Sequence, residues 1–297
     1  MELEAYLATK RMLVDGALER WLPEADTPPV KLHEAMRYSL FAGGKRLRPI
    51  LCLASAEAVG GTEAQALPAA CALECIHTYS LIHDDLPAMD DDDFRRGRPT
   101  SHKVFGEGLA ILAGDALLTY AFQLLVDPAL YEPGVEPKVL AEVVSAVASA
   151  AGAAGMVGGQ VADLEAEGRE VEAEGLAFIH THKTAALIRA SVVAGALLGS
   201  GSKADVEALA LYGSSVGLAF QIVDDILDVV GDAETLGKAV GGDAAHAKAT
   251  YPAVHGLEAS RAEAARLVGE ACGALEPFGD KGEPLRALAL FVAERNL

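Results

Sequence analysis

The sequence predicts an all-α protein that folds as one domain over residues 1–297. Apolar residues recur at intervals of three and four along most of the chain, and Ala and Leu abound. No segment shows the alternating pattern of a strand flanked by hairpin turns. Pro and Gly cluster near residues 22–30, 127–138, 231–245 and 273–284, which separates helices but leaves no linker long enough to divide the chain.

Composition and charge argue against several classes of protein. A net charge of −19 and a pI near 4.7 disfavour nucleic acid or an anionic membrane as a partner, because like charges repel. The amino-terminal residues are acidic and contain no apolar signal sequence, so we expect a cytoplasmic protein. The long uncharged stretch at residues 143–162 is rich in Ala, Gly and Ser, which predicts a closely packed core helix and no membrane span.

The first candidate site is an acidic run with six carboxylates in residues 84–93. Such a run is stable only when water or cations separate the charges. A solvated surface turn is the plain alternative, because acidic proteins carry many such clusters. However, the apolar helical segment 73–83 leads directly into the run, and Pro87 bends or ends that helix. We therefore expect the acids to cap a buried helix.

A second acidic cluster, residues 224–228, lies within the apolar helical segment 217–230. Asp224 and Asp228 are four residues apart and share a helix face among core-like neighbours. Buried carboxylates without partners are costly, and a metal ion is the partner that lets several stay ionised together. Two such clusters facing across a helical bundle could hold Mg²⁺ through carboxylates, waters and phosphate oxygens. The pattern therefore indicates a diphosphate substrate.

Two groups of cations accompany the acids. Residues 43–49 read GGKRLRP, and residues 95–98 read RRGR directly after the first acidic run. Each group alone is equally compatible with a helix cap and ordinary surface cations. Together with the metal-binding carboxylates they indicate a shared anionic ligand, because the planar fork of Arg suits bidentate contacts with phosphate.

These motifs resemble those of the bacterial short-chain isoprenyl diphosphate synthases, and of farnesyl diphosphate synthase in particular. The resemblance covers nearly the whole chain. It rests on GGKRLRP at 43–49, IHTYSLIHDDLPAMDDDDFRRGRPTSH at 76–102, GGQVADL at 158–164, HTHKTAALIRA at 180–190, GLAFQIVDDILD at 217–228, and LGK followed by KATYP. The spacing from Asp84-Asp85 to Asp90 is similar to that of the bacterial type. Gly242 departs from the bulkier or charged residue that several relatives carry.

The resemblance implies a bundle of roughly ten or more mostly antiparallel helices around a deep central cavity, and a homodimer. It also implies Mg²⁺ as the cofactor, with three ions per site and Mn²⁺ able to substitute. The implied metal ligands are Asp84, Asp90 and Asp224, assisted by Asp85 and Asp228. The implied site for isopentenyl diphosphate is Lys45, Arg48, His77 and Arg96. The implied allylic site is Arg95, Lys183, Thr184, Gln221, Lys238 and Lys248.

The reaction implied by the resemblance joins isopentenyl diphosphate to dimethylallyl or geranyl diphosphate by ionisation of the allylic partner. The implied catalytic residues are Lys183, Thr184, Gln221 and Arg95. Without the resemblance, His77 would be interpreted as an ordinary core histidine. The expected product is farnesyl diphosphate.

The expected product length depends on two residues before Asp84. On a helical wheel Ser80 lies within about 40° of Asp84, beneath the metal-bound diphosphate, whereas Tyr79 is turned about 140° away. The resemblance nevertheless implies that Tyr79 is the aromatic floor of a farnesyl-type cavity. A simple core aromatic is the alternative for Tyr79.

Three other functions fit parts of the pattern. A geranylgeranyl diphosphate synthase would share the mechanism and make a longer product. A terpene cyclase would need only one diphosphate, which leaves GGKRLRP and His77 unexplained. A regulatory subunit of a heteromeric synthase, the non-enzyme alternative, is expected to lose aspartates from one cluster, and this chain keeps both.

Overall fold

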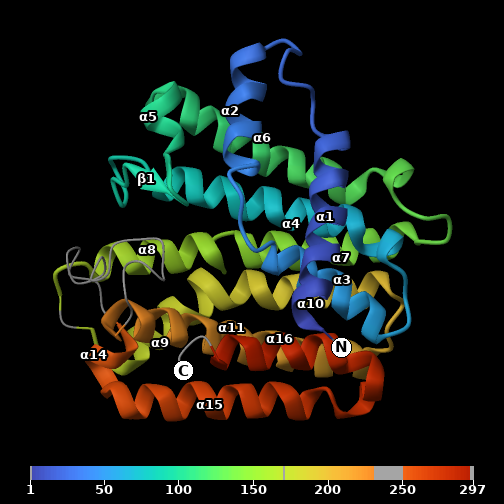
Figure 1. Cartoon of the computed structure of the whole chain (residues 1–297), viewed down its shortest axis with the longest axis vertical. Coiled ribbons are helices and arrows are strands. Elements are labelled where there is room, and N and C mark those ends of the chain that lie inside the picture. Colours follow the sequence, from blue (N-terminus) through green and yellow to red (C-terminus); the bar gives the residue numbers. More distant parts are fainter. Residues whose placement is uncertain (1, 170, 231–249, 295–297) are drawn as a thin grey trace.

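The computed structural model describes residues 2–169, 171–230 and 250–294, and these residues are overwhelmingly helical, as predicted. Most of the helices lie side by side, while α1 and α2 stand across them (Figure 1). The first half contains α1 (Leu3–Trp21), α2 (Val30–Leu40), α3 (Leu47–Ala58), α4 (Glu63–Asp84), α5 (Ser101–Phe105), α6 (Glu107–Val126), the 3₁₀ turn η1 (Pro128–Leu130) and α7 (Pro137–Ala151). The second half contains α8 (Met156–Ala166), α9 (Ala173–Ile179), the π-helical segment η2 (His180–Ala185), α10 (Ala186–Leu198), α11 (Lys203–Val230), α14 (Tyr251–His255), α15 (Leu257–Ala274), the 3₁₀ segment η3 (Glu276–Gly282) and α16 (Glu283–Glu294).

The helix α4 forms because most of its 22 residues are apolar and its first turn is capped. The hydroxyl of Thr62 accepts from the backbone N–H of Gln65, and the Gln65 side chain accepts in return from the backbone of Thr62. Buried apolar side chains along the helix pack against α6 and α3. This packing fixes the position of the helix end at Asp84, where the first acidic run begins.

The core has two apolar clusters. One surrounds α4, α6 and α7, and the other surrounds α11, α15 and α16, which form the lower layer in Figure 1. Helices α3 and α10 contribute buried side chains to both clusters and join them. A small antiparallel hairpin, β1 (Phe94–Arg95) and β2 (Arg98–Pro99), follows the acidic run. The hairpin carries the second group of cations.

Three segments are long and apolar enough to cross a membrane by length and composition alone, namely Glu107–Val126, Pro137–Ala166 and Lys203–Val230. The third of these is α11, which carries the second acidic cluster and packs against α10 and α15. The stretch 143–162, expected to be one core helix, instead spans the end of α7, a turn at residues 152–155 and most of α8. The Gly residues in that turn explain the break.

Candidate active site

The first acidic run folds into a turn at the end of α4. The backbone N–H of Asp90 donates to the carbonyl of Asp84 at 2.9 Å, and the N–H of Asp91 donates to the carbonyl of Leu86 at 3.1 Å. Residues 86–89 therefore loop out, and the chain returns Asp90 to the side of Asp84. This arrangement brings together the two aspartates that were expected to be the principal ligands on this side.

Asp85 lies behind that turn and is paired with a cation of the hairpin. Its Oδ1 accepts from Nε of Arg95 at 2.6 Å, and the same guanidinium contacts Asp92 at 3.3 Å. Burial raises the pKa of Asp85 to about 6, although the charge of Arg95 opposes the rise. Arg95, expected on the allylic side, is thus held against the first acidic run.

Arginines gather around His77, as the two cationic motifs suggested. Burial and the positive charges of the nearby arginines, Arg48 and Arg96 foremost, hold the pKa of His77 well below its usual value. The imidazole is therefore neutral at pH 7. Arg96 donates to the carbonyl of Gly43, and a Cβ at Gly44 would lie 2.5 Å from its Nη1. The glycines of GGKRLRP allow this close approach, which joins the two motifs.

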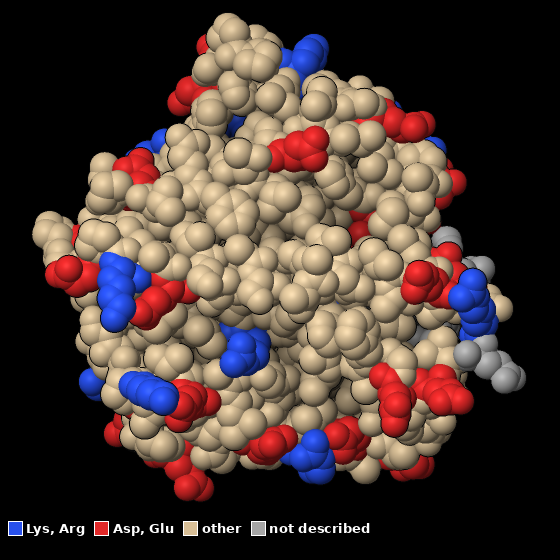
Figure 2. Space-filling view, turned by 180° about the vertical axis from the view of Figure 1, so that it is seen from behind, with Lys and Arg blue, Asp and Glu red and all other residues tan. Residues whose placement is uncertain are grey.

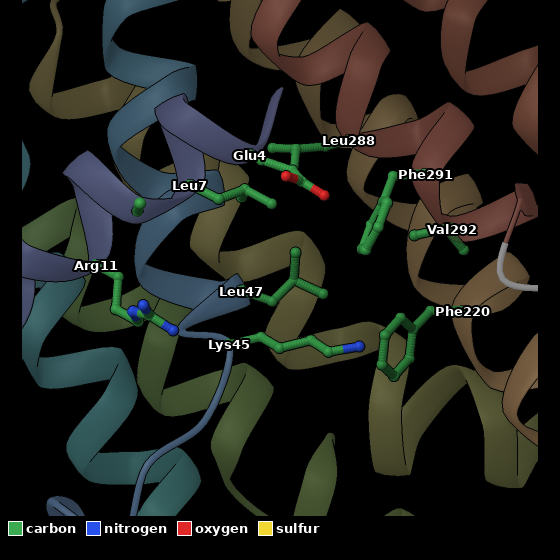
Figure 3. A pocket seen from close by; sticks show the side chains of 10 residues that line it. Glu4, Leu7, Arg11, Lys45, Leu47, Phe220, Leu288, Phe291 and Val292 are labelled. Carbon is green, nitrogen blue, oxygen red and sulfur yellow. The ribbon is translucent and has the colours of Figure 1, made fainter. Parts of the chain in front are cut away.

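Lys45, the remaining member of the expected isopentenyl diphosphate site, points into a cavity of about 230 Å³ between α1, α3, α11 and α16. Its ammonium approaches Phe220 and lies 5.7 Å from the ring centroid of Phe291 (Figure 3). Phe220 immediately precedes Gln221 on α11. The cavity therefore connects the GGKRLRP segment with the helix that carries the second acidic cluster.

The carboxylates of the second acidic cluster have different surroundings. Asp225 is buried and accepts from Nε2 of Gln221 at 2.9 Å and from the backbone N–H of Tyr251 at 2.7 Å. The Nε2 atom of His180 lies 3.3 Å from the same carboxylate. Asp225 therefore ties α11 to α14 and to the π-helical segment, which leaves Asp224 and Asp228 as the pair that shares a face.

The expected catalytic residues on the second side lie in and beside the π-helical segment. Such segments recur at functional sites. Thr184 donates to Oε1 of Gln221 at 2.7 Å, and Lys183 pairs with Asp163 of α8 at 2.5 Å. A Cβ at Gly159 would lie 2.2 Å from the backbone nitrogen of Lys183, so only glycine lets α8 pack this closely.

The residues thought to set product length lie on different sides of α4. Ser80 is half-buried and donates to the carbonyl of His77 at 2.9 Å. Tyr79 is buried, and its ring meets His83 edge-on at 5.6 Å. The Nε2 atom of His83 in turn lies 3.1 Å from the carbonyl oxygen of Ile111 on α6. Tyr79 is therefore linked to α6 through His83.

Both acidic clusters act on the arginine group, since Arg95 pairs with Asp85 of the first cluster and the charge of Asp224 in the second acts on Arg48. Burial lowers the pKa of Arg48 to about 10, and the negative charges of Glu74 and Asp224 oppose this lowering. Arg48 is thus close to α11 as well as to α4. Oxygen ligands from both helices form a donor set that suits Mg²⁺. Asp84, Asp90, Asp224 and Asp228 are the residues that would hold it.

Asp91, Asp93 and His102 also place ligand atoms within 4.8 Å of one another, and Lys103 already pairs with Asp93 at 2.6 Å.

Some predicted residues lie outside the described part of the chain, and some contributors were missed. Lys238, Gly242 and Lys248 belong to residues 231–249, which the structure does not describe. The residues missed were Glu74, Asp163, His180 and Asp225. Asp163 and His180 stood within the motifs quoted for the resemblance, so their position in GGQVADL and HTHKTAALIRA was the available signal. Glu74 had a simpler signal, because it is the one acid between the two ends of the helix 63–84.

A helical bundle that carries two aspartate clusters and an adjoining group of arginines is typical of the class of trans-prenyl synthases. The chain matches the sequence profile of polyprenyl synthetases over residues 29–277. It is 52% identical over 296 residues to "Heterodimeric geranylgeranyl pyrophosphate synthase large subunit 1, chloroplastic" from Arabidopsis thaliana, covering 98% of this chain and 79% of the relative. It is 48% identical to geranylgeranyl diphosphate synthase from Cyanophora paradoxa, covering 99% and 97%. The crystal structure of an FPP/GFPP synthase from Zymomonas mobilis superposes with a TM-score of 0.87 at 38% identity, covering 98% of each chain. The chain belongs to the polyprenyl synthetase family, which confirms the resemblance seen in its motifs.

Proposed function

We propose that this chain condenses isopentenyl diphosphate with allylic diphosphates in a magnesium-dependent reaction. The observation that carries the proposal is the convergence of both aspartate clusters and the arginine group on one region, which suits two diphosphates and their cations. The test is turnover of labelled isopentenyl diphosphate with dimethylallyl or geranyl diphosphate, with and without Mg²⁺. Products without isopentenyl incorporation would instead indicate a cyclase.

The residues of the chain suggest a division of labour. Arg48 and Arg96 bind isopentenyl diphosphate beside neutral His77, which can accept or donate a hydrogen bond without adding charge. Bound Mg²⁺ would supply Lewis-acid stabilisation of the leaving diphosphate. Lys183 adds positive charge on the allylic side. The Gln221 carboxamide oxygen, held by the hydroxyl of Thr184, stabilises the allylic carbocation.

The proposed main product is geranylgeranyl diphosphate. The two sequence relatives described above bear that product in their names and match 98–99% of this chain. Farnesyl diphosphate, the product expected from the sequence, is the second candidate, and buried Tyr79 one turn before His83 favours it. The Zymomonas mobilis enzyme of similar fold is named for both farnesyl and longer products. The wild-type product therefore has to be measured.

Two variants connect product length to α4. If the wild type stops at fifteen carbons, Tyr79→Ala should release elongation to twenty, because removing the ring deepens the cavity. If the wild type already reaches twenty carbons and Tyr79→Ala changes nothing, Tyr79 is a core aromatic. Ser80→Phe should shorten the product in either case, since Ser80 lies nearer the aspartate face. Chromatography of the dephosphorylated products distinguishes these results.

We further propose that the working form is a homodimer. Figure 2 shows a broad face with few charged side chains in its middle, on a protein whose net charge is −19. Large apolar side chains are exposed on α6 and α8, among them Ile111, Leu112, Val157 and Val161. Exposed apolar area of this kind is typical of subunit interfaces. Light scattering on the purified chain, compared with Leu112→Asp, tests the proposal, and a monomeric wild type would contradict it.

A further inference from the structure

A buried glutamate, Glu74, lies close to the arginines of the proposed diphosphate site. Glu74 is 1% exposed and stands one turn before His77 on α4, so the two residues share a helix face. Its Oε1 accepts from Nη1 of Arg46 at 2.9 Å, an ion pair in which both side chains are 2% exposed. Its Oε2 is buried and has no hydrogen-bond partner within the described residues.

The charge of Glu74 reaches beyond Arg46. Burial lowers the pKa of Arg48 and of Arg96, and in both cases Glu74 is the strongest negative charge that opposes the lowering. Arg48 nevertheless has a buried Nε without a hydrogen-bond partner among the described residues. Glu74 thus compensates the charge of two arginines in addition to that of Arg46, its ion-pair partner.

Arg46 differs from Arg48 and Arg96 because all three nitrogens of its guanidinium group donate hydrogen bonds within the protein. Its Nε donates to Asp15 at 2.8 Å and its Nη2 donates to the carbonyl of Leu40 at 2.7 Å. Arg46 therefore has a structural role: its ion pair holds the Glu74 carboxylate in place, and we do not expect Arg46 to contact a ligand. A diphosphate that contacts Arg48 and Arg96 would approach the same charges that Glu74 compensates.

We propose that Glu74 is a positioning residue that serves as the internal counter-ion of Arg48 and Arg96, and that it opposes binding of a diphosphate at these arginines. The inference rests on the proposed function, because it takes this arginine group as a diphosphate site. With no ligand bound, the carboxylate stabilises the positive charges of half-buried Arg48 and of Arg96. When a diphosphate binds at Arg48 and Arg96, the negative charge of Glu74 repels it. The affinity of the site for diphosphate is therefore lower, which favours exchange of ligands.

The test is binding of inorganic pyrophosphate without metal to the full chain and to Glu74→Gln, which keeps the shape and removes the charge. Calorimetry should show binding about tenfold tighter in Glu74→Gln, since loss of one nearby like charge is worth about one decade. The ligand-free variant should melt at a lower temperature, and pyrophosphate should raise its Tm more than it raises that of the wild type. In turnover, KM for isopentenyl diphosphate should fall while KM for the allylic substrate stays unchanged.

Glu57→Gln is the matched control. Like Glu74, Glu57 forms an ion pair with a buried cation, in this case Lys10, but it lies outside the arginine group. It should lower Tm without changing the affinity for pyrophosphate. If Glu74→Gln behaves like Glu57→Gln, the role of Glu74 is only structural and the inference is wrong. Should Glu74→Gln fail to fold, recovery of folded protein by pyrophosphate supports the inference, and failure to recover overturns it.

Arg48→Ala separates this inference from the proposed function. Pyrophosphate binding to the wild type that is lost in Arg48→Ala supports the diphosphate site, whatever Glu74 does. Equal binding to the wild type and Arg48→Ala would overturn the diphosphate site itself and the inference with it. Loss in Arg48→Ala combined with unchanged affinity in Glu74→Gln would overturn only the counter-ion role.

Discussion

The two aspartate clusters have similar compositions but are held by different means. The first occupies a turn after α4, where a backbone hydrogen bond places Asp90 beside Asp84 and a hairpin arginine pairs with Asp85. The second lies inside a continuous helix, where Asp225 is buried and ties three elements together. In the first cluster the backbone fold creates the ligand spacing, and in the second the helix repeat creates it.

This difference shows that neighbouring aspartates within one cluster have different roles. In the turn, Asp85 has one guanidinium partner and sits next to two carboxylates that are placed by the backbone. In α11, Asp225 orients Gln221 and accepts the N–H of Tyr251, so part of the second cluster is structural support. Substitutions of Asp84 and Asp90, which the backbone places, should therefore affect mainly the chemistry, while substitutions in the second cluster should divide into chemical and structural effects.

The largest expected effect is loss of turnover when a metal-facing carboxylate is removed from either side. Asp84→Ala and Asp224→Ala should each lower kcat by roughly a thousandfold or more, because a fixed group that stabilises the developing charge is lost. The helical circular dichroism should stay unchanged. The control is Asp280→Ala, an exposed aspartate in η3 that should keep full activity. Near-normal turnover in either site variant would rule out the two-cluster arrangement.

A smaller effect, but one on two properties at once, is expected at Asp225. Asp225→Asn replaces one carboxylate oxygen by an amide nitrogen that cannot accept from Gln221 or Tyr251. We expect the free energy of unfolding to fall by about 1–3 kcal/mol, the cost of leaving a buried donor unpaired. Turnover should fall by about a hundredfold as Gln221 loses its orientation. Urea denaturation and steady-state kinetics measure the two effects, and an unchanged stability would place Asp225 with the metal-facing acids.

The cations should divide according to which cluster they accompany. Arg48→Ala should raise KM for isopentenyl diphosphate by about ten- to a hundredfold, the loss of a charge-assisted hydrogen bond, with little change for the allylic substrate. Lys183→Ala should instead raise KM for the allylic substrate or lower kcat. Equal effects of both variants on both substrates would show that the assignment of Arg48 and Lys183 to separate diphosphates is wrong.

The features that depend on local sequence pattern could be predicted from the sequence, whereas contacts between segments far apart in the chain could not. Helical periodicity gave the fold class, and the i, i+4 spacing separated Asp224 and Asp228 from Asp225. The ion pair of Arg95 with Asp85 requires the hairpin to fold back, which no spacing rule states. The contact of α8 with the π-helical segment requires a glycine at Gly159, whose role appears only when both backbones are placed. The helical wheel turns Tyr79 away from Asp84 and the resemblance makes it the cavity floor, so the role of Tyr79 stays a prediction.

The smallest expected effect concerns the protonation of Asp85 and sharpens the comparison within the turn. In the protein its pKa is about 6, above the ordinary 3.8, because burial disfavours the charged form more than Arg95 favours it. Between these values the folded state holds a proton that the unfolded state has lost. The contribution of this carboxyl to stability therefore decreases as pH rises from about 4 to 6.

Arg95→Gln removes the charge that lowers this pKa, so the pKa of Asp85 should rise further, by about one unit. Carbon-13 NMR of the aspartate carboxyls, titrated without metal, measures the shift, and Lys103→Gln is the control because Lys103 pairs with exposed Asp93 instead. Repeating the titration with Mg²⁺ tests whether Asp85 assists the metal. Direct or water-mediated binding should lower its pKa below that of the metal-free protein, since a cation favours the ionised form. An Asp85 titration that does not respond to Mg²⁺, beside an Asp84 that does, would make Asp85 the counterpart of Asp225, a supporting carboxylate that holds the turn through Arg95.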